Sequence, residues 1–223
     1  WGSAIRGMRN PMNSWEKGDS HRDGCYHTPL CYKSKYYTVG PNDQKLMTAL
    51  RNAGTDHRKF MRMITVYVDI TAPLYWWKEF DTYKVGTVAN SCSTMHKIAD
   101  KEFTIEDFSH EHLIDEPIYI HEGLDNNEKR IIATGLLYDT IFCLNVFRKK
   151  FLETKDKKYW WQMIQLLPSS YNQHRTVMLN YEVLANIYKS RKNHKLDEWS
   201  VGFIDWIKSL PYSELITGDT INR

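Results

Sequence analysis

The strongest constraint on the fold is an alternating segment that runs directly into an Ala-Pro pair. Residues 62–71 read RMITVYVDIT. The apolar, mostly β-branched side chains recur at every second position, at Ile64, Val66, Val68 and Ile70. This period and composition predict a strand with one apolar face. Pro73 follows Ala72 and suits the first turn of a helix, so the next segment, LYWWKEFDTY, is predicted to be helical.

A loop of small polar residues is predicted to follow that helix. Its members are Gly86, Thr87, Asn90, Ser91, Cys92, Ser93 and Thr94. Short side chains leave backbone N–H groups accessible, so such a loop suits an anion or a planar ligand. Cys92 would be a nucleophile only if a cation lowered its pKa, and a structural role is commoner for such a residue.

The rest of the chain predicts helices around a small sheet. A short helix is expected over 41–54, where Asn42 or Asp43 can cap the start and Gly54 ends it. SAIRGMR near the start is compatible with a strand or a short helix, and residues 100–127 read as short pieces or loop. Later helices are expected over 127–154, 159–166, 175–192 and 197–210. We therefore expect one α+β domain over residues 1–223, with a small antiparallel or mixed sheet and a helical second half.

Composition narrows the class of partner. The chain has 223 residues and a formal charge of +3, which is too small to favour nucleic acid or a membrane as the main partner. No apolar run approaches the roughly 18 residues of a membrane span, and no signal peptide is visible. The cysteines form no C-x-x-C pair; they are Cys25, Cys31, Cys92 and Cys143. Free thiols fit a reducing compartment, so we expect a cytoplasmic protein.

Two further patterns carry chemistry. Asn180, Asn186 and Arg191 fall on the helix expected over 175–192, where Asn180 and Arg191 would share one face. The segment SHEHLIDEP brings His110 and His112 close enough to reach one metal ion, but a solvated loop is the commoner structure for such a segment. No metal site is predicted from it, and a metal hydrolase built on this pair is the weakest of three functional hypotheses. The chain has neither a P-loop nor a G-x-G-x-x-G motif.

Together these segments resemble the flavin-dependent thymidylate synthase family. After Ala72-Pro73, the residues Thr82-Tyr83-Lys84 stand where that family has R-H-R. The segment 90–95, NSCSTM, is similar to the family's N-E-x-S-x-R with one residue inserted. Leu167-Pro168, Asn180, Asn186 and Arg191 follow at the family's spacings. Residues 54–57, GTDH, and the early SAIRGMR are also similar to family segments, so the resemblance spans most of the chain in order.

The resemblance implies a homotetramer whose active sites are built from several subunits. The expected ligands are FAD and dUMP, with NADPH and methylene-tetrahydrofolate as co-substrates. Arg191 would be the catalytic residue and would also contact the uracil of dUMP. The flavin would be bound by Asn180, Asn186, Lys84, Tyr83 and His57. The nucleotide would be bound by Glu79, where the family usually has Gln, and by Ser91, Cys92, Ser93 and Thr94.

The chain also departs from the family pattern. Thr82 and Tyr83 have replaced basic residues, Thr94 or Met95 stands where the family has a phosphate-binding Arg, and Glu182 stands where it has another Arg. Each lost charge-assisted contact is worth roughly 1.5–3 kcal/mol. These replacements motivate a second hypothesis, a catalytically inactive homologue that acts as a nucleotide- or protein-binding module.

Overall fold

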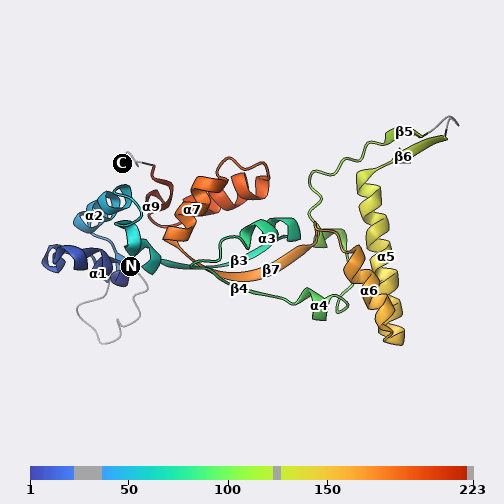
Figure 1. The fold of residues 1–223 in the computed structure, drawn as a ribbon, viewed down its shortest axis with the longest axis horizontal. Coiled ribbons are helices and arrows are strands. Elements are labelled where there is room, and N and C mark those ends of the chain that lie inside the picture. Colours follow the sequence, from blue (N-terminus) through green and yellow to red (C-terminus); the bar gives the residue numbers. More distant parts are fainter. Residues whose placement is uncertain (23–36, 123–126, 220–223) are drawn as a thin grey trace. The chain divides into compact units, whose positions relative to one another are not determined.

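The computed structural model describes residues 1–22, 37–122 and 127–219, and the chain divides into two compact units (Figure 1). Unit 1 consists of Trp1–Val68, Tyr83–Ala89 and Val177–Arg223, and unit 2 of Asp69–Thr82 and Asn90–Thr176. The boundaries fall within strands β3 (Thr65–Pro73), β4 (Val88–Ser91) and β7 (Asn172–Asn180). The expected single domain over residues 1–223 remains a prediction.

The predicted small sheet is confirmed, as is the α+β class. Its strand order is β3-β7-β4. Side-chain hydrogen bonds fix the direction of the first pair, because Thr71 pairs with His174 at 2.9 Å while Asp69 pairs with Thr176 at 2.6 Å. Residue numbers decrease along β3 as they increase along β7, so the two strands are antiparallel. The strand predicted over 62–71 corresponds to β3.

The helix predicted over 175–192 is wrong in its first part. Residues up to Asn180 belong to β7, and helix α7 covers only Tyr181–Arg191. The alternation that buries Val177 and Leu179 has a period of two, and Asn180 has the side chain favoured at a helix N-cap. Asn180 and Arg191 therefore do not lie on one helix face.

Unit 1 is built around a short 3₁₀ helix, η4 (Arg58–Met63), against which α1 (Gly2–Arg9) and α7 pack. Its other helices are η1 (Asn10–Met12), η2 (Trp15–Lys17), α2 (Pro41–Asn52), the π-helix η6 (Glu198–Phe203), α8 (Ile204–Ser209) and α9 (Glu214–Thr217). A two-residue antiparallel pair joins β1 (His21–Arg22) to β2 (Tyr37–Thr38). The core contains Met8, Met47, Phe60, Leu184 and Ile187.

The predicted cap of α2 is also wrong. The N-cap is Gly40, with Pro41 at the first helical position, as Pro prefers. Asp43 turns inward instead, because its carboxylate meets the buried guanidinium of Arg9 at 2.6 Å. Its second oxygen accepts from the backbone N–H and the hydroxyl of Ser20. This buried network joins α1, the segment after η2 and the start of α2.

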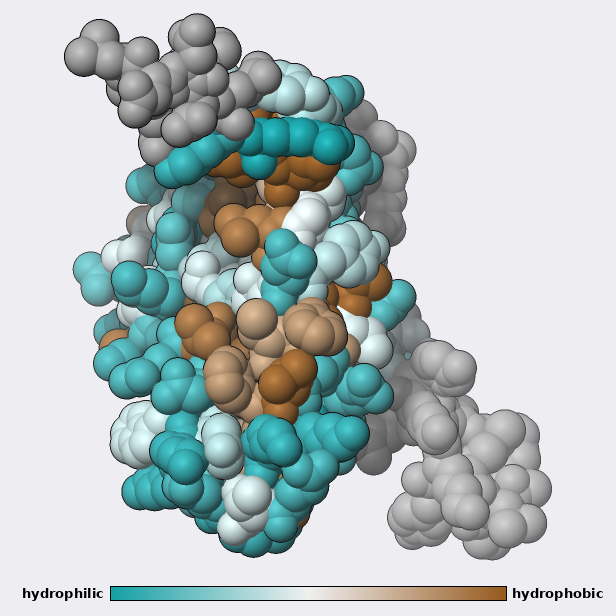
Figure 2. All heavy atoms as spheres, turned by 90° about the vertical axis from the view of Figure 1, so that its right-hand side faces the viewer, coloured by the Kyte–Doolittle hydropathy of each residue, from teal (hydrophilic) through white to brown (hydrophobic). Residues whose placement is uncertain are grey.

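Unit 2 combines helices with a hairpin. Helices α5 (Ala133–Thr154) and α6 (Lys157–Leu166) lie side by side (Figure 1). The smaller elements are α3 (Leu74–Phe80), α4 (Thr94–Lys97) and η5 (Ile105–Asp107). The core packs Phe103, Phe108, Leu144 and Met163 together. One face of α5 is left uncovered within the unit, and Figure 2 shows hydrophobic side chains gathered amid hydrophilic ones on the face of the molecule that carries this helix.

The helix predicted over 127–154 begins later than expected. Residues Asn127–Ile131 form β6, which pairs antiparallel with β5 (Ile118–Glu122) in the register Ile118 to Ile131. The cross-strand pairing overrides the helical propensity of this charged segment. β5 also lies in a region that the sequence suggested to be irregular.

Two smaller points complete the fold. No helix in the described part of the chain is long and apolar enough to cross a membrane. Cys92 and Cys143 are free, exposed thiols, whereas Cys25 and Cys31 lie outside the described residues.

Candidate functional site

The predicted site residues fall into two groups. Unit 1 carries His57, Tyr83, Lys84, Asn180, Asn186 and Arg191. Unit 2 carries Glu79, Ser91, Cys92, Ser93 and Thr94. The predicted flavin contacts and the predicted catalytic residue thus belong to one unit, and the loop predicted to hold the nucleotide belongs to the other.

Arg191, in the last turn of α7, lies against two aromatic rings. Its Nε donates a hydrogen bond of 2.9 Å to the hydroxyl of Tyr83. Its guanidinium carbon is 5.6 Å from the ring centroid of Tyr83 and 4.9 Å from that of Trp199. Both distances are within cation–π range. The structure therefore brings together two residues that the sequence predicted separately, and adds Trp199 as a third.

Trp199 lies near the start of the π-helix η6. The residue is fully buried, and its ring makes edge contacts with Phe203 at 5.4 Å and His194 at 6.4 Å. A π-helical turn shifts the side chains that follow it and is often found near functional sites. The sequence predicted only a regular helix over 197–210, so nothing in its periodicity pointed to this tryptophan.

Asn180 connects α7 to the segment around Gly86. Its Oδ1 accepts from the backbone N–H of Val183 at 3.0 Å and so caps α7, while its Nδ2 donates to the carbonyl of Gly86 at 3.3 Å. Gly86 has φ +80°, and a Cβ there would lie 2.7 Å from Nδ2. Both ends of this amide serve the fold, and its predicted flavin contact remains a prediction.

Asn186 lies next to a charged pair that the sequence did not reveal. Arg58 donates from Nη2 to Oδ1 of Asn186 at 3.2 Å, and its Nε meets Glu182 Oε2 at 2.9 Å. Glu182 and Asn186 are four residues apart, so they present one face of α7 to the same guanidinium. Arg58 directly follows the exposed His57. Two predicted flavin contacts, His57 at the start of η4 and Asn186 on α7, therefore lie on neighbouring elements.

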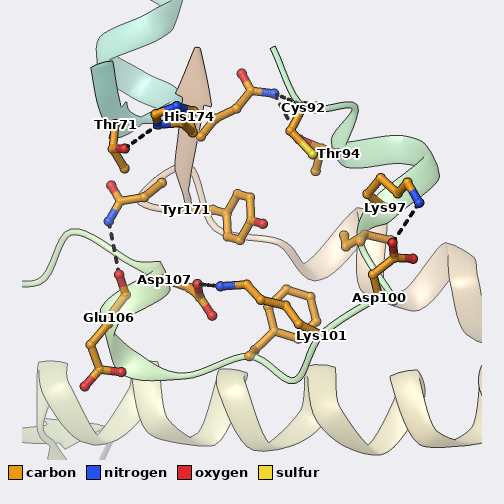
Figure 3. A pocket seen from close by; sticks show the side chains of 14 residues that line it. Thr71, Cys92, Thr94, Lys97, Asp100, Lys101, Glu106, Asp107, Tyr171 and His174 are labelled. Carbon is orange, nitrogen blue, oxygen red and sulfur yellow. Dashed lines mark hydrogen bonds and ion pairs between the residues drawn. The ribbon is translucent and has the colours of Figure 1, made fainter. Parts of the chain in front are cut away.

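The segment predicted to be a small-residue loop is partly regular, because Val88–Ser91 forms β4 and Thr94–Lys97 forms α4. In unit 2, the part of this loop that follows β4 borders a cavity of about 530 Å³ (Figure 3). Cys92 and Thr94 line it, whereas Ser91 and Ser93 are exposed and Glu79 is half-buried on α3. Gln173 holds the loop to β7, because its Nε2 donates to the Cys92 carbonyl at 3.2 Å and to the Thr94 hydroxyl at 3.0 Å. Tyr171 and His174 complete this side of the cavity.

Both lysines of this cavity are held in ion pairs. Lys97 meets Asp100 at 2.9 Å, and Lys101 pairs with Asp107. The hydrogen bond to Asp100 raises the pKa of Lys97, and the hydrogen bond to Asp107 raises that of Lys101. Glu106 is a third carboxylate in the lining. With two lysines and three carboxylates, the lining has a formal charge of −1. A phosphate entering here would have to compete with carboxylates already bound to both lysines.

The other predicted residues are more dispersed. Lys84 is exposed beside Tyr83, in unit 1. His110 is held by its own segment, since its Nδ1 lies 2.8 Å from the carbonyl of Phe108. No group of three or more His, Cys, Asp or Glu residues that could hold a metal ion occurs within residues 1–22, 37–122 and 127–219.

Solved structures with a similar fold are known, although no protein-family model and no curated protein matches the sequence. One is thymidylate synthase X (ThyX) from Helicobacter pylori with FAD and dUMP, at 14% identity and a TM-score of 0.62, covering 97% of this chain and 91% of that one. A second structure of that flavin-dependent enzyme, also with FAD and dUMP, gives 14% identity and 0.61, covering 96% and 91%.

A third similar structure is the UMP/dUMP methylase PolB from Streptomyces cacaoi, bound with 5-Br UMP. It is 14% identical with a TM-score of 0.54, and the match covers 81% of this chain and 84% of that one. At such identities, similarity over most of both chains establishes the architecture and leaves the chemistry open. The chain has the α+β fold of the flavin-dependent thymidylate synthases.

Proposed function

We propose that this chain is an FAD-dependent enzyme that modifies the pyrimidine ring of a nucleotide, most simply by converting dUMP to dTMP. The observation that carries the proposal is the clamp formed by Tyr83, Trp199 and Arg191, because it orients a guanidinium at the position where the resemblance expects the catalytic Arg. The fold supports the same proposal, since similar structures contain FAD, dUMP or 5-Br UMP.

Each residue would then have a defined role. Arg191 would face the uracil and stabilise the negative charge that develops on the ring during reduction. Because aromatic rings hold the guanidinium in place, little reorganisation would be needed at the moment of reaction. Bound flavin supplies the redox chemistry of hydride transfer. His57, Lys84 and Asn186, all on unit 1, would hold the flavin, while Asn180 sets the start of α7.

The nucleotide contacts rest on the second group of residues. Ser91, Cys92, Ser93 and Thr94 would offer hydroxyl and backbone N–H groups to dUMP, and Glu79 would stand where a Gln is usual. NADPH and methylene-tetrahydrofolate are the co-substrates that the resemblance implies. A homotetramer is part of the same proposal, as is a cytoplasmic location.

A binding module without catalysis is the second candidate function. The observation that favours it is the cavity in unit 2, where Lys97 and Lys101 are each paired with a carboxylate beside the loop predicted to hold phosphate. A chain that has lost its phosphate-binding cations can retain the fold while binding a different nucleotide or a protein.

The deciding experiment is the visible absorption spectrum of the purified protein, followed by titration with FAD in the presence and absence of dUMP. The enzyme proposal predicts a bound-flavin band that shifts when dUMP is added. It also predicts that Arg191→Ala lowers dTMP formation by a factor on the order of 10² to 10³ while flavin binding persists. No flavin binding at saturating FAD would favour the binding module.

A further inference from the structure

Glu182 and Arg58 form a charged pair in which the carboxylate is the more buried partner. The side chain of Glu182 is 8% exposed and that of Arg58 is 16% exposed. Glu182 lies in the first turn of α7, where the helix dipole also stabilises a negative charge. The Glu182 carboxylate holds Nε and the Asn186 oxygen holds Nη2, so two contacts orient the guanidinium of Arg58.

The groups that remain at the surface of this cluster are hydrogen-bond donors. A guanidinium has donors only, and a carboxamide has one acceptor oxygen and one donor nitrogen. The acceptor oxygen of Asn186 already receives Nη2 of Arg58, so its exposed amide presents Nδ2. The outer edge of the Arg58 guanidinium and this Nδ2 therefore form a surface suited to a ligand that has acceptors only, such as phosphate.

A second guanidinium, that of Arg51, lies near this cluster. Burial lowers the pKa of Arg51 and the charge of Arg58 lowers it further, which shows that the two groups lie near each other. Arg51 is anchored by the carbonyls of Leu215 and Ile216 at 3.2 and 3.3 Å. Arg58 is thus paired with the buried Glu182, while Arg51 lies near both Arg58 and the exposed carboxylate of Asp219.

The pair also accounts for an unexpected residue in the sequence. Glu182 stands where the resemblance expects Arg, so α7 has exchanged a cation for an anion at this position. Arg58 restores the cation from η4 and depends on Glu182 to hold it. We propose that Arg58 and Asn186 form a phosphate-binding subsite for a nucleotide ligand of this chain, which builds on the proposed function by naming the group that the subsite recognises.

The test compares ligands that differ only in their phosphate. The two pairs are riboflavin with FMN, and deoxyuridine with dUMP. For each pair, calorimetry gives the ratio of the two dissociation constants, here called the phosphate preference. Arg58→Met should lower the phosphate preference of one pair roughly tenfold to hundredfold, which is the usual strength of a charge-assisted contact. The pair that responds identifies whether the flavin or the pyrimidine nucleotide supplies the phosphate.

Matched variants separate recognition from folding. Glu182→Gln keeps a hydrogen-bond partner for Arg58 but removes the neutralising charge, so it should raise the phosphate preference several-fold. Arg58→Met leaves the buried carboxylate of Glu182 unpaired, which destabilises the fold. The double variant Arg58→Met/Glu182→Gln removes the same guanidinium without leaving a buried charge. Arg62→Met removes an exposed cation from the same element and should leave the preference unchanged.

The outcomes distinguish this inference from the proposed function. If Arg58→Met and Glu182→Gln weaken riboflavin and FMN equally, the pair is structural only and the inference is overturned. If the wild-type chain binds no flavin and no nucleotide, the proposed function fails, and inorganic pyrophosphate becomes the probe. Pyrophosphate binding that the double variant abolishes would then support the subsite, whereas an absence of pyrophosphate binding would overturn it.

Discussion

At the scale of single residues, Tyr83 contributes two separable contacts to Arg191. The hydroxyl accepts a hydrogen bond from Nε, and the ring gives a cation–π contact at 5.6 Å. A hydrogen bond to a charged group contributes about 1.5–3 kcal/mol, and a cation–π contact at a partly exposed site about 0.5–1 kcal/mol. In the proposed site, Tyr83 would therefore orient the Arg191 guanidinium.

Tyr83→Phe should therefore weaken dUMP binding to the flavin-loaded protein by roughly tenfold, because only the hydroxyl is removed. Tyr83→Leu should weaken it several-fold more, since the ring is lost as well. The readout is the dUMP-dependent shift of the flavin band, with the thermal midpoint as a control for folding. Equal affinity in the wild type and in both variants would show that Tyr83 does not position Arg191.

A second residue-scale prediction concerns pH. Burial raises the pKa of Asp43, but hydrogen bonds from Ser20 and Arg9 and from the backbone N–H groups of Ser20 and Asp19 lower it by more, so the net pKa lies below its ordinary value of 3.8. A depressed folded-state pKa contributes stability that is fully present above the unfolded value and is lost as the pH falls through the folded one.

Asp43→Asn should lower the free energy of unfolding at pH 7 by about 3–5 kcal/mol, because Arg9 is left buried without its counter-ion. The variant should also lose less stability than the wild type between pH 5 and pH 3, since it lacks the titrating group. Urea unfolding at both pH values measures this. If the variant lost as much free energy of unfolding as the wild type between pH 5 and pH 3, groups other than Asp43 would be responsible for the acid dependence.

At the scale of elements, the cap of α7 is the point where fold and site meet. Asn180→Ala removes the acceptor for the Val183 N–H and the donor to Gly86, and should cost about 1–2 kcal/mol of stability. Asn180→Asp keeps the acceptor for the Val183 N–H and adds a favourable charge at the helix start, but it places a carboxylate oxygen against the Gly86 carbonyl, so it should recover only part of this loss.

Denaturant midpoints of the two variants test the cap, and FAD titration tests the predicted flavin contact separately. A purely structural Asn180 predicts that the Asp variant binds FAD as the wild type does. Loss of FAD affinity in an Asp variant that remains folded at the titration temperature would instead support a direct contact between the amide and the flavin.

The elements also show how far sequence reasoning reaches. The strand over 62–71 and the helix over 159–166 were predictable because each has one clear period and a Pro nearby. The helices over 127–154 and 175–192 were each extended into a strand, since pairing with another strand decided the conformation of residues 127–131 and 175–180. Arg191 was singled out by the resemblance, through its spacing from Asn180 and Asn186, whereas Arg58 and Trp199 meet their neighbours only in the folded chain.

At the scale of the whole molecule, the uncovered face of α5 bears on assembly. Tyr138, Phe142 and Val146 recur at helical spacing and are exposed, Phe142 by 69%. Apolar patches of this kind are often interaction sites. Asp139 follows Tyr138 at the start of the stripe and Lys150 lies beyond its end, so in an antiparallel second copy of α5 the acidic end of one stripe would face the basic end of the other. This self-complementarity favours another copy of the chain as the partner.

Phe142→Glu should therefore shift the chain from an oligomer to a smaller species. Because Phe142 is exposed within unit 2, its replacement should leave the free energy of unfolding of a monomer within about 0.5 kcal/mol. Light scattering after size exclusion gives the mass, and Tyr119→Glu, an equally apolar-to-acidic change at an exposed position on β5, is the matched control. A wild-type mass equal to one chain, or an oligomer that survives Phe142→Glu, would exclude this face as the contact. Loss of the oligomer in Phe142→Glu but not in Tyr119→Glu would identify this face of α5 as the contact between copies.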